Sequence, residues 1–227
     1  MDVAFTPAEA PAVPTGIVVD VLRATSTIVQ ALEAGYRRVL CCAEIEEARS
    51  LRNELEEGVL GGERLALKIP GFDLGNSPRE FLEPRAETLL LTTTNGTRAI
   101  VAAARSCETV LIGSLLNLDA VAAAARERGA DVAVLCAGVD GRLALDDAYC
   151  AGRIAELLGG ERTDTAEAAL RIARSFASPQ EALAASENPR QSTLLDDIAW
   201  CARESVCRVV PRFTQMRGAA AELALEK

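Results

Sequence analysis

The sequence lacks histidine altogether. This absence excludes catalysis by Ser-His-Asp or Cys-His groups, phosphatase chemistry based on histidine, and metal sites with histidine ligands. Acid–base and metal chemistry must therefore come from aspartate, glutamate, lysine, arginine, cysteine or water. Oxygen ligands favour hard cations such as Mg²⁺, Mn²⁺ or Ca²⁺.

Long apolar runs and a secretory signal are also missing. No run approaches the roughly 18–20 apolar residues that span a bilayer, and the first residues do not combine a basic region with an apolar stretch. The seven cysteines form no C-x-x-C pair and lie mostly among apolar residues. We therefore expect a cytoplasmic protein with no membrane partner, no disulfide framework and no structural zinc site.

Basic residues are scarcer than acidic ones, and the net charge is −9. A nucleic-acid-binding protein normally presents a basic face, so we expect no nucleic-acid partner. A small anionic ligand is still compatible with this charge, because a pocket responds to its local charges. Lysine is much rarer than arginine, since apart from Lys227 there is only Lys68. The ammonium group of Lys68 would suit one oxygen of a phosphate or carboxylate. Retention of this lysine by chance is the alternative.

Strand-like and helix-like stretches alternate through the first two thirds of the chain. Three segments share one layout, in which an apolar β-rich run leads through a polar loop into a helix. Their apolar runs are residues 16–19, 89–91 and 132–135, and the helices that follow are residues 26–34, 97–104 and 143–158. Strands at 37–42 and 108–113 and helices at 44–57 and 117–128 fill the intervals. This alternation predicts an α/β fold of the three-layer α/β/α kind, with a largely parallel or mixed sheet.

The rest of the chain departs from this layout. Residues 61–85 are dense in Gly, Pro, Asn and Asp and predict a long functional loop, with Phe72 and Leu74 as its anchors. After residue 160 we expect helices at 164–176, 179–186 and 193–204, a short apolar run at 206–210, and a terminal helix or frayed end over 218–227. We expect one domain over residues 1–227, with a soft subdivision near residue 160; a division into two similar lobes is left open.

The loops of the three shared segments place polar residues where α/β proteins bind ligands, outside the carboxyl ends of strands. Thr93, Thr94, Asn95 and Gly96 form a candidate phosphate cradle, because hydroxyls, an amide and a glycine precede a helix N-terminus. An ordinary helix cap uses the same residue types. Asp20 ends an apolar strand, and we favour it as a metal ligand or nucleophile.

Carboxylates and arginines supply the other expected groups. Two or three converging carboxylates with waters are enough for Mg²⁺. The acids in or beside the loops are Asp20, Glu63, Asp73, Asp140, Asp146 and Asp147. Arginines can hold acidic groups through two parallel hydrogen bonds, and the candidates are Arg23, Arg64, Arg98 and Arg142. Some of these arginines are expected to form only surface ion pairs.

Cys136 and Arg142 fit the C-x5-R pattern of the cysteine-dependent phosphatases. In that chemistry a thiolate attacks phosphorus while the loop amides and the arginine hold the oxygens. Two features count against it here. Leu143 stands where that family usually has Ser or Thr, and Asp140 inside the loop is expected to raise the pKa of the thiol.

Several stretches together carry a resemblance over residues 1–158. They are VDVLRATST at 19–27, GGER at 61–64, KIPGFDLGNSP at 68–78, TTTNGT at 92–97, Gly113-Ser114, CAGVDGR at 136–142, and Asp146-Asp147. In order and spacing the chain resembles the 2-phosphosulfolactate phosphatase family. The resemblance implies an α/β/α fold and Mg²⁺-dependent hydrolysis of 2-phosphosulfolactate to sulfolactate and phosphate, a step of coenzyme M biosynthesis.

Matching positions in that family give the expected roles. The metal candidates are Asp20, Glu63 and Asp140, and the catalytic candidates are Asp20, Arg23, Lys68 and Arg142. The substrate-binding candidates are Arg64, Asn76, Ser77, Thr93, Asn95, Gly96 and Gly141. The attacking group, water or the Asp20 carboxylate, is left open. Outside enzyme chemistry, the alternative is a non-catalytic binder of anionic metabolites. A homodimer is the base-rate expectation.

Overall fold

The strands form a single ten-stranded sheet in the part of the chain that the computed structural model describes, which is residues 1–129, 131–187 and 195–225. The strand order is β1-β8-β2-β7-β9-β10-β3-β6-β4-β5. The strands are β1 Asp2–Ala4, β2 Thr15–Val19, β3 Arg38–Cys41, β4 Val59–Arg64, β5 Leu67–Lys68, β6 Thr88–Thr92, β7 Thr109–Gly113, β8 Val132–Cys136, β9 Arg212–Arg217 and β10 Ala220–Ala224. The helices are α1 Ala24–Glu33, α2 Ile45–Leu55, α3 Gly96–Ser106, α4 Leu118–Glu127, α5 Leu145–Leu158, α6 Asp164–Arg174, α7 Pro179–Ala185 and α8 Leu195–Cys201. Short 3₁₀ turns occupy Pro7–Glu9, Pro78–Glu80 and Leu115–Asn117.

Two parallel blocks of strands make up most of the sheet. One block is β1, β8, β2 and β7, and the other is β3, β6 and β4. The antiparallel hairpin β9–β10 joins them, pairing with β7 on one side and β3 on the other. Three antiparallel steps reverse the strand direction, so the two blocks run in opposite senses.

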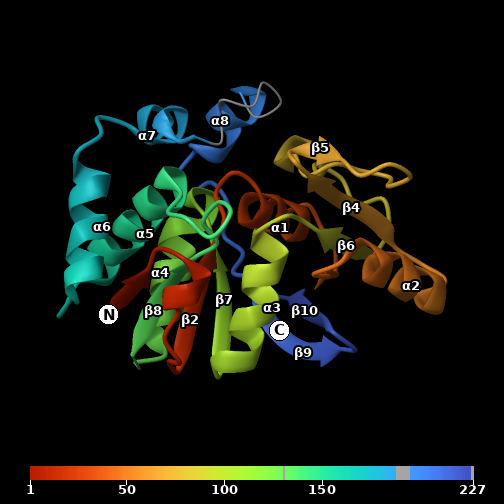
Figure 1. The fold of residues 1–227 in the computed structure, drawn as a ribbon, viewed down its shortest axis with the longest axis horizontal. Helices are drawn as coiled ribbons and strands as arrows, with labels where there is room; N and C mark the ends of the chain where they lie inside the picture. The colour runs from red at the N-terminus through yellow and green to blue at the C-terminus, as the bar shows by residue number, and fades with distance from the viewer. Residues whose placement is uncertain (130, 188–194, 226–227) are drawn as a thin grey trace.

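Helices cover both faces of the sheet (Figure 1). Side chains alternate between the two faces along each strand. In β2, Val18 packs into the apolar cluster that contains α1 and α3, whereas Ile17 and Val19 pack into the cluster that contains α4 and α5. Helix α2 closes a third cluster over β3, β4 and β6. The expected three-layer α/β/α fold with a mixed sheet is confirmed.

The C-terminal tail differs most from the expectation. A terminal helix or frayed end was expected over 218–227, but residues 220–224 form β10 in the middle of the sheet. Ala220, Ala221 and Leu223 are buried there, and β10 pairs with β9 and β3. An Ala- and Glu-rich segment favours a helix in isolation, but burial and strand pairing on both sides override that preference. The apolar run at 206–210 forms no strand.

The long loop expected over 61–85 is partly strand. It begins inside β4 and includes β5, although its anchors are as expected, since Phe72 and Leu74 are both buried. The helices expected at 164–176 and 179–186 are present as α6 and α7. Helix α8 begins at Leu195, and residues 193–194 of the predicted helix lie outside the described residues. No helix among the described residues is long and apolar enough to cross a membrane.

Candidate active site

A pocket of 80 Å³ lies where the ends of both strand blocks meet. Its walls come from the loops after β2, β4, β6 and β8, together with Asn76. The lining residues are Asp20, Leu22, Arg23, Glu63, Leu65, Ala66, Asn76, Thr94, Asn95, Gly138, Val139 and Asp140. The fold therefore brings together seven residues that the sequence singled out as site candidates: Asp20, Arg23, Glu63, Asn76, Thr94, Asn95 and Asp140. Their chemical roles stay predictions.

Asp20 follows β2 directly and faces the start of α3. Its Oδ1 accepts a hydrogen bond from the backbone N–H of Ala24 at 3.1 Å, in the first turn of α1. A Cβ at Gly96 would overlap both Asp20 Oδ2 and the Ala24 side chain. Gly96 is thus required for the close approach of Asp20 Oδ2 to the N-terminus of α3, which is favourable for negative charge.

The protonation of Asp20 is perturbed by its surroundings. The pKa of Asp20 is raised to about 7, with burial as the largest cause and the nearby carboxylates of Asp146 and Glu63 acting in the same direction. The N–H of Ala24 and the charge of Arg23 act in the opposite direction. A carboxyl group with a pKa near neutrality can gain or lose a proton under working conditions, which suits acid–base chemistry.

Two buried acids at the start of α5 hold the loop that carries Asp20. Asp147 accepts hydrogen bonds from the backbone N–H of Val21 at 2.9 Å and of Gly138 at 3.0 Å. Asp146 accepts from the N–H of Leu22 at 3.1 Å and from Ser186 Oγ at 2.7 Å. Burial raises the pKa of Asp147 well above its usual range, with a further contribution from Asp146. These acids shape the pocket from behind rather than lining it.

Glu63 ties β4 to the candidate phosphate cradle. Its carboxylate accepts hydrogen bonds from Thr94 N–H at 2.7 Å, from Thr94 Oγ1 at 3.2 Å and from Ala66 N–H at 2.8 Å. Both carboxylate oxygens are therefore engaged. Glu63 fixes the position of the TTTNGT loop relative to the β4–β5 turn.

The cradle itself is held by its own threonines. Thr93 N–H donates to Thr97 Oγ1 at 3.0 Å, and Thr97 N–H donates to Thr93 Oγ1 at 3.1 Å. Thr93 is buried, while Asn95 directly precedes α3, makes no capping hydrogen bond through its side chain, and lines the pocket. Arg64 does not line the pocket: it lies behind the loop and donates to Thr92 Oγ1 at 2.9 Å.

Arg23 reaches the pocket in a fixed orientation. Its Nη1 donates to Asp197 Oδ2 at 2.8 Å, and its Nη2 donates to the carbonyl of Ala66 at 3.3 Å. Ser77, outside the pocket lining, donates from Oγ to Asp197 Oδ1 at 2.6 Å. Asp197 was not among the site residues predicted from the sequence. The only signal was an acid pair, Asp196-Asp197, which also reads as ordinary acids at a helix start.

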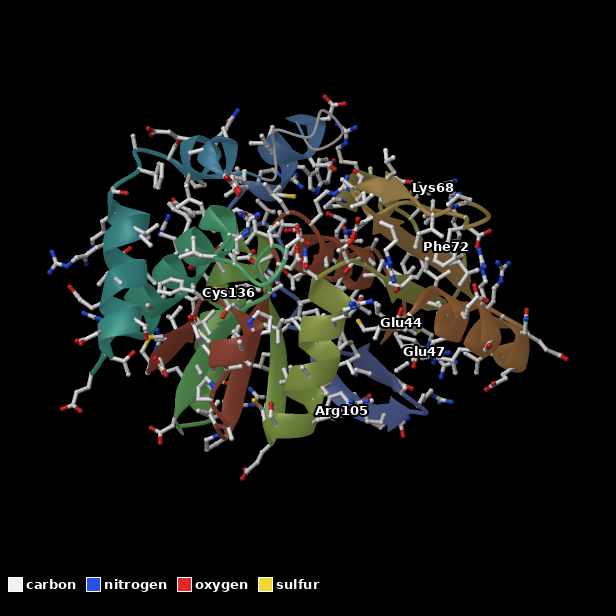
Figure 2. The ribbon with its side chains drawn as sticks, in the orientation of Figure 1. Glu44, Glu47, Lys68, Phe72, Arg105 and Cys136 are labelled. Atoms are coloured by element: carbon white, nitrogen blue, oxygen red, sulfur yellow. The ribbon has the colours of Figure 1, made fainter. Side chains whose placement is uncertain are left out.

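Gly96, next to the lining residue Asn95, is not itself part of the pocket lining, and Lys68, Gly141 and Arg142 also lie outside it. Lys68 is exposed on β5 and donates from Nζ to the Asp73 carbonyl at 3.3 Å. Figure 2 shows it at the edge of the molecule, well away from Cys136. Gly141 and Arg142 are exposed, and Arg142 lies 4.0 Å from Glu187. The roles proposed for Lys68, Gly141 and Arg142 rest on the sequence alone.

Cys136 and Arg142 do not form a phosphate loop around the pocket. The side chain of Cys136 is 1% exposed, and burial is the largest cause raising the pKa of its thiol well above the ordinary value. The nearby acids Asp147 and Asp146 raise this pKa further. The Arg142 side chain is 69% exposed. This geometry provides neither a thiolate nor an arginine facing it.

The pocket can offer oxygen ligands to a hard cation. Among the described residues, no group of three or more His, Cys, Asp or Glu side chains is arranged to hold a metal ion, so Asp20, Glu63 and Asp140 share a pocket without forming a three-acid cage. Mg²⁺, however, commonly binds through one or two carboxylates, waters and substrate oxygens. Asn76 Oδ1 is buried without a hydrogen-bond partner in the described structure. With the Asp20 carboxylate, it makes a donor set that fits Mg²⁺ bound in this way.

Comparison with known proteins adds independent evidence. A family model described as 2-phosphosulpholactate phosphatase matches residues 4–216. A Thermus thermophilus protein named probable 2-phosphosulfolactate phosphatase is 42% identical over 221 residues, covering 93% of this chain and 91% of the relative. A Methanothermobacter thermautotrophicus protein named 2-phosphosulfolactate phosphatase is 39% identical over 206 residues, with 88% and 87% coverage. A Deinococcus radiodurans protein named probable 2-phosphosulfolactate phosphatase is 40% identical over 205 residues, with 86% and 85% coverage.

Proposed function

The chain belongs to the 2-phosphosulfolactate phosphatase family, and on that premise we propose that it hydrolyses 2-phosphosulfolactate to sulfolactate and phosphate in a Mg²⁺-dependent reaction. The observation that carries the proposal is the position of Asp20 Oδ2, which lies against Gly96 at the N-terminus of α3. On this proposal, a reactive carboxylate adjoins a seat for phosphate oxygens at the start of α3.

The phosphoryl group would sit at the start of α3. Backbone N–H groups in the first turn of a helix lack partners within the helix and favour an anion. Asn95 lines the pocket at this point, and Arg23 provides a guanidinium beside it. These groups orient the phosphoryl oxygens and offset charge that develops during transfer, which is most of what a protein contributes to this reaction.

The charge of the lining supports a metal requirement. The pocket lining contains three acidic side chains, Asp20, Glu63 and Asp140, and one cationic side chain, Arg23. A substrate with phosphate, sulfonate and carboxylate groups would be repelled by such a lining. Bound Mg²⁺ would supply the missing positive charge and polarise the phosphoryl oxygens. The Asp20 carboxylate, through the oxygen that does not react, and Asn76 Oδ1 would hold it, with waters and a substrate oxygen.

Asp20 is the proposed centre of the chemistry. One of its oxygens is held by the Ala24 N–H, and the other faces the phosphate seat. That second oxygen either attacks phosphorus or accepts a proton from the attacking water. In both routes the P–O bond to sulfolactate breaks and the leaving oxygen takes up a proton. In the first route, water then hydrolyses the phospho-aspartate and releases phosphate. Rapid quenching in acid separates these routes, since the first leaves a phospho-aspartate on the protein and the second does not.

The reaction class is tested by phosphate release from racemic 2-phosphosulfolactate, with phospholactate as the matched ester lacking the sulfonate. We expect turnover in Mg²⁺, loss of turnover in excess EDTA, recovery when Mg²⁺ is restored, and preference for the sulfonated ester. Activity that survives EDTA would favour the alternative of a cysteine-dependent phosphatase using Cys136. Tight binding of the ester without turnover would favour the non-catalytic binder. The proposal also includes a cytoplasmic location and a homodimer; light scattering of the purified protein tests the latter.

A further inference from the structure

Helix α8 carries a buried acid that the proposed reaction does not itself require. Asp197 has 1% of its surface exposed and lies in the last third of the chain, far in sequence from the motifs that build the pocket. Burying a carboxylate is costly unless it is paired and hydrogen-bonded. Both of its oxygens have partners, because Oδ2 accepts from Arg23 and Oδ1 accepts from Ser77.

We propose that Asp197 is a positioning residue that acts through Arg23, fixing its guanidinium at the mouth of the pocket for the anionic substrate. The inference rests on the proposed function, because it assigns Arg23 to substrate binding. Asp197 does not line the pocket and is not expected to touch the substrate.

The geometry of Arg23 supports this role. A guanidinium has five N–H groups in a rigid plane. In the described structure Arg23 uses one Nη1 group on Asp197 and one Nη2 group on the Ala66 carbonyl. Two anchors on different nitrogens fix the plane of the group. The remaining N–H groups are left for a ligand in the pocket that Arg23 lines.

Asp197 also links Arg23 to the segment that carries Asn76. Ser77 donates to Asp197 at 2.6 Å, and Thr27 Oγ1 in α1 donates to the Asn76 carbonyl at 2.8 Å. Arg79 approaches the same carboxylate from the exposed side, at 3.5 Å. One buried carboxylate thus sets the relative positions of Arg23 and the Asn76–Ser77 segment.

The decisive experiment is a double-mutant cycle on kcat/KM for phosphate release, using Asp197→Asn, Arg23→Ala and the double variant. The matched control is Asp196→Asn, the neighbouring exposed acid of α8, which we expect to stay within about twofold of the parent. Asp197→Asn should lower kcat/KM by roughly tenfold to a hundredfold, mainly through a higher KM, because a misplaced guanidinium binds the substrate poorly. In the Arg23→Ala background the same substitution should change kcat/KM by less than about twofold.

Equal losses in both backgrounds would mean that Asp197 acts through the general fold, and would overturn the inference. If Asp197→Asn does not fold, Ser77→Ala removes one partner of the carboxylate and is expected to lower kcat/KM several-fold only when Arg23 is present. Equal effects in both backgrounds would again overturn the inference.

Calorimetric binding of inorganic phosphate separates this inference from the proposed function. If the wild-type protein shows no turnover, the proposed phosphatase activity is refuted. Even then, the inference about Asp197 predicts that Asp197→Asn binds inorganic phosphate more weakly than Asp196→Asn does. The inference fails if the two variants bind phosphate equally or if the wild-type protein does not bind it.

Discussion

Strands β2 and β8 pair in parallel with Val19 opposite Cys136, so the loops that follow them start side by side. Each loop matches a known kind of phosphate chemistry, through Asp20 in one and the C-x5-R pattern in the other. Their environments differ. Asp20 lines the pocket and has a pKa raised to about 7, whereas Cys136 packs into the apolar cluster with α4 and α5.

The direction of one side chain decides this difference. Cys136 is the last residue of β8, and its side chain points to the same face as Val19, into the core. Asp20 lies one residue past the end of β2, where the chain turns toward α1 and its carboxylate meets Ala24 and Gly96. A motif with suitable residue types is therefore insufficient, because the nucleophile must also face the ligand.

Replacement of Asp20 should have the largest effect. Asp20→Asn keeps the size and one oxygen of the side chain but removes its charge and basicity. We expect kcat/KM for 2-phosphosulfolactate to fall by roughly 10³-fold, the scale of a lost acid–base or nucleophilic group. Asp73→Asn is a suitable control, because Asp73 lies outside the pocket and pairs with Arg52. Wild-type activity in Asp20→Asn would show that the Asp20 carboxylate takes no part in the chemistry.

The raised pKa of Asp20 has a consequence for stability. The folded state keeps this proton up to a pH of about 7, while the unfolded chain releases it near the ordinary value of 3.8. The folded state therefore binds more protons between these values, and stability falls as the pH rises through this window. Relative to Asp20→Asn, wild type should lose on the order of 3 kcal/mol of unfolding free energy between about pH 4 and pH 8.

Urea unfolding at several pH values in EDTA measures this difference. Comparison with Asp20→Asn isolates Asp20 from Asp147, whose pKa is also raised. A difference in stability between the two proteins that stays constant over the window would show that Asp20 has an ordinary pKa in the folded state.

Gly96→Ala sharpens the comparison by closing the phosphate seat without removing any polar group. The new Cβ would overlap Asp20 Oδ2 and Ala24, so α1 and α3 must move apart. We expect a loss of roughly 10²-fold in kcat/KM, because small displacements of reacting groups are costly. The control is Arg98→Ala in the same turn of α3, where the exposed arginine pairs with Glu44. Full activity of Gly96→Ala would show that the phosphate seat is wrongly located. An equal loss in Arg98→Ala would show that the effect is not specific to Gly96.

The smallest effects are expected in the β8 loop. Cys136→Ala fits the apolar cluster and leaves the pocket lining unchanged, and Arg142→Ala removes an exposed side chain. Both should retain kcat/KM within about twofold, measured with the same substrate. Thermal unfolding checks that Cys136→Ala is folded. A hundredfold loss of kcat/KM in either variant would show that the β8 loop, and not only the β2 loop, takes part in the chemistry.

Much of the fold followed from local pattern. Buried parallel strands read as continuous apolar runs, which is why β2, β6 and β8 and their loops were predicted near their observed positions. The prediction for the C-terminal tail was wrong because the sequence of β10 favours a helix in isolation. Its pairing with neighbouring strands in the sheet makes it a strand. Nothing local predicts that a hairpin from the end of the chain joins the two parallel blocks.

The site was predictable to a similar extent. Asp20 and Asn95 follow strands, so sequence reasoning could place them near a ligand. Glu63 lies inside β4, in a segment predicted as a loop, and was singled out as one of the acids beside the loops. Asp197 was missed because its role depends on Arg23, which is distant in sequence and close only in the folded chain. Conversely, Lys68 was singled out by its rarity, and rarity carries no information on position.

The most direct test of the comparison is a structure of the protein with its product, inorganic phosphate, in the presence of Mg²⁺. We predict phosphate at the N-terminus of α3, in contact with Arg23 and beside Asp20, with Cys136 remote and buried. Phosphate held by the backbone of residues 137–141, with Cys136 and Arg142 turned toward it, would contradict the account.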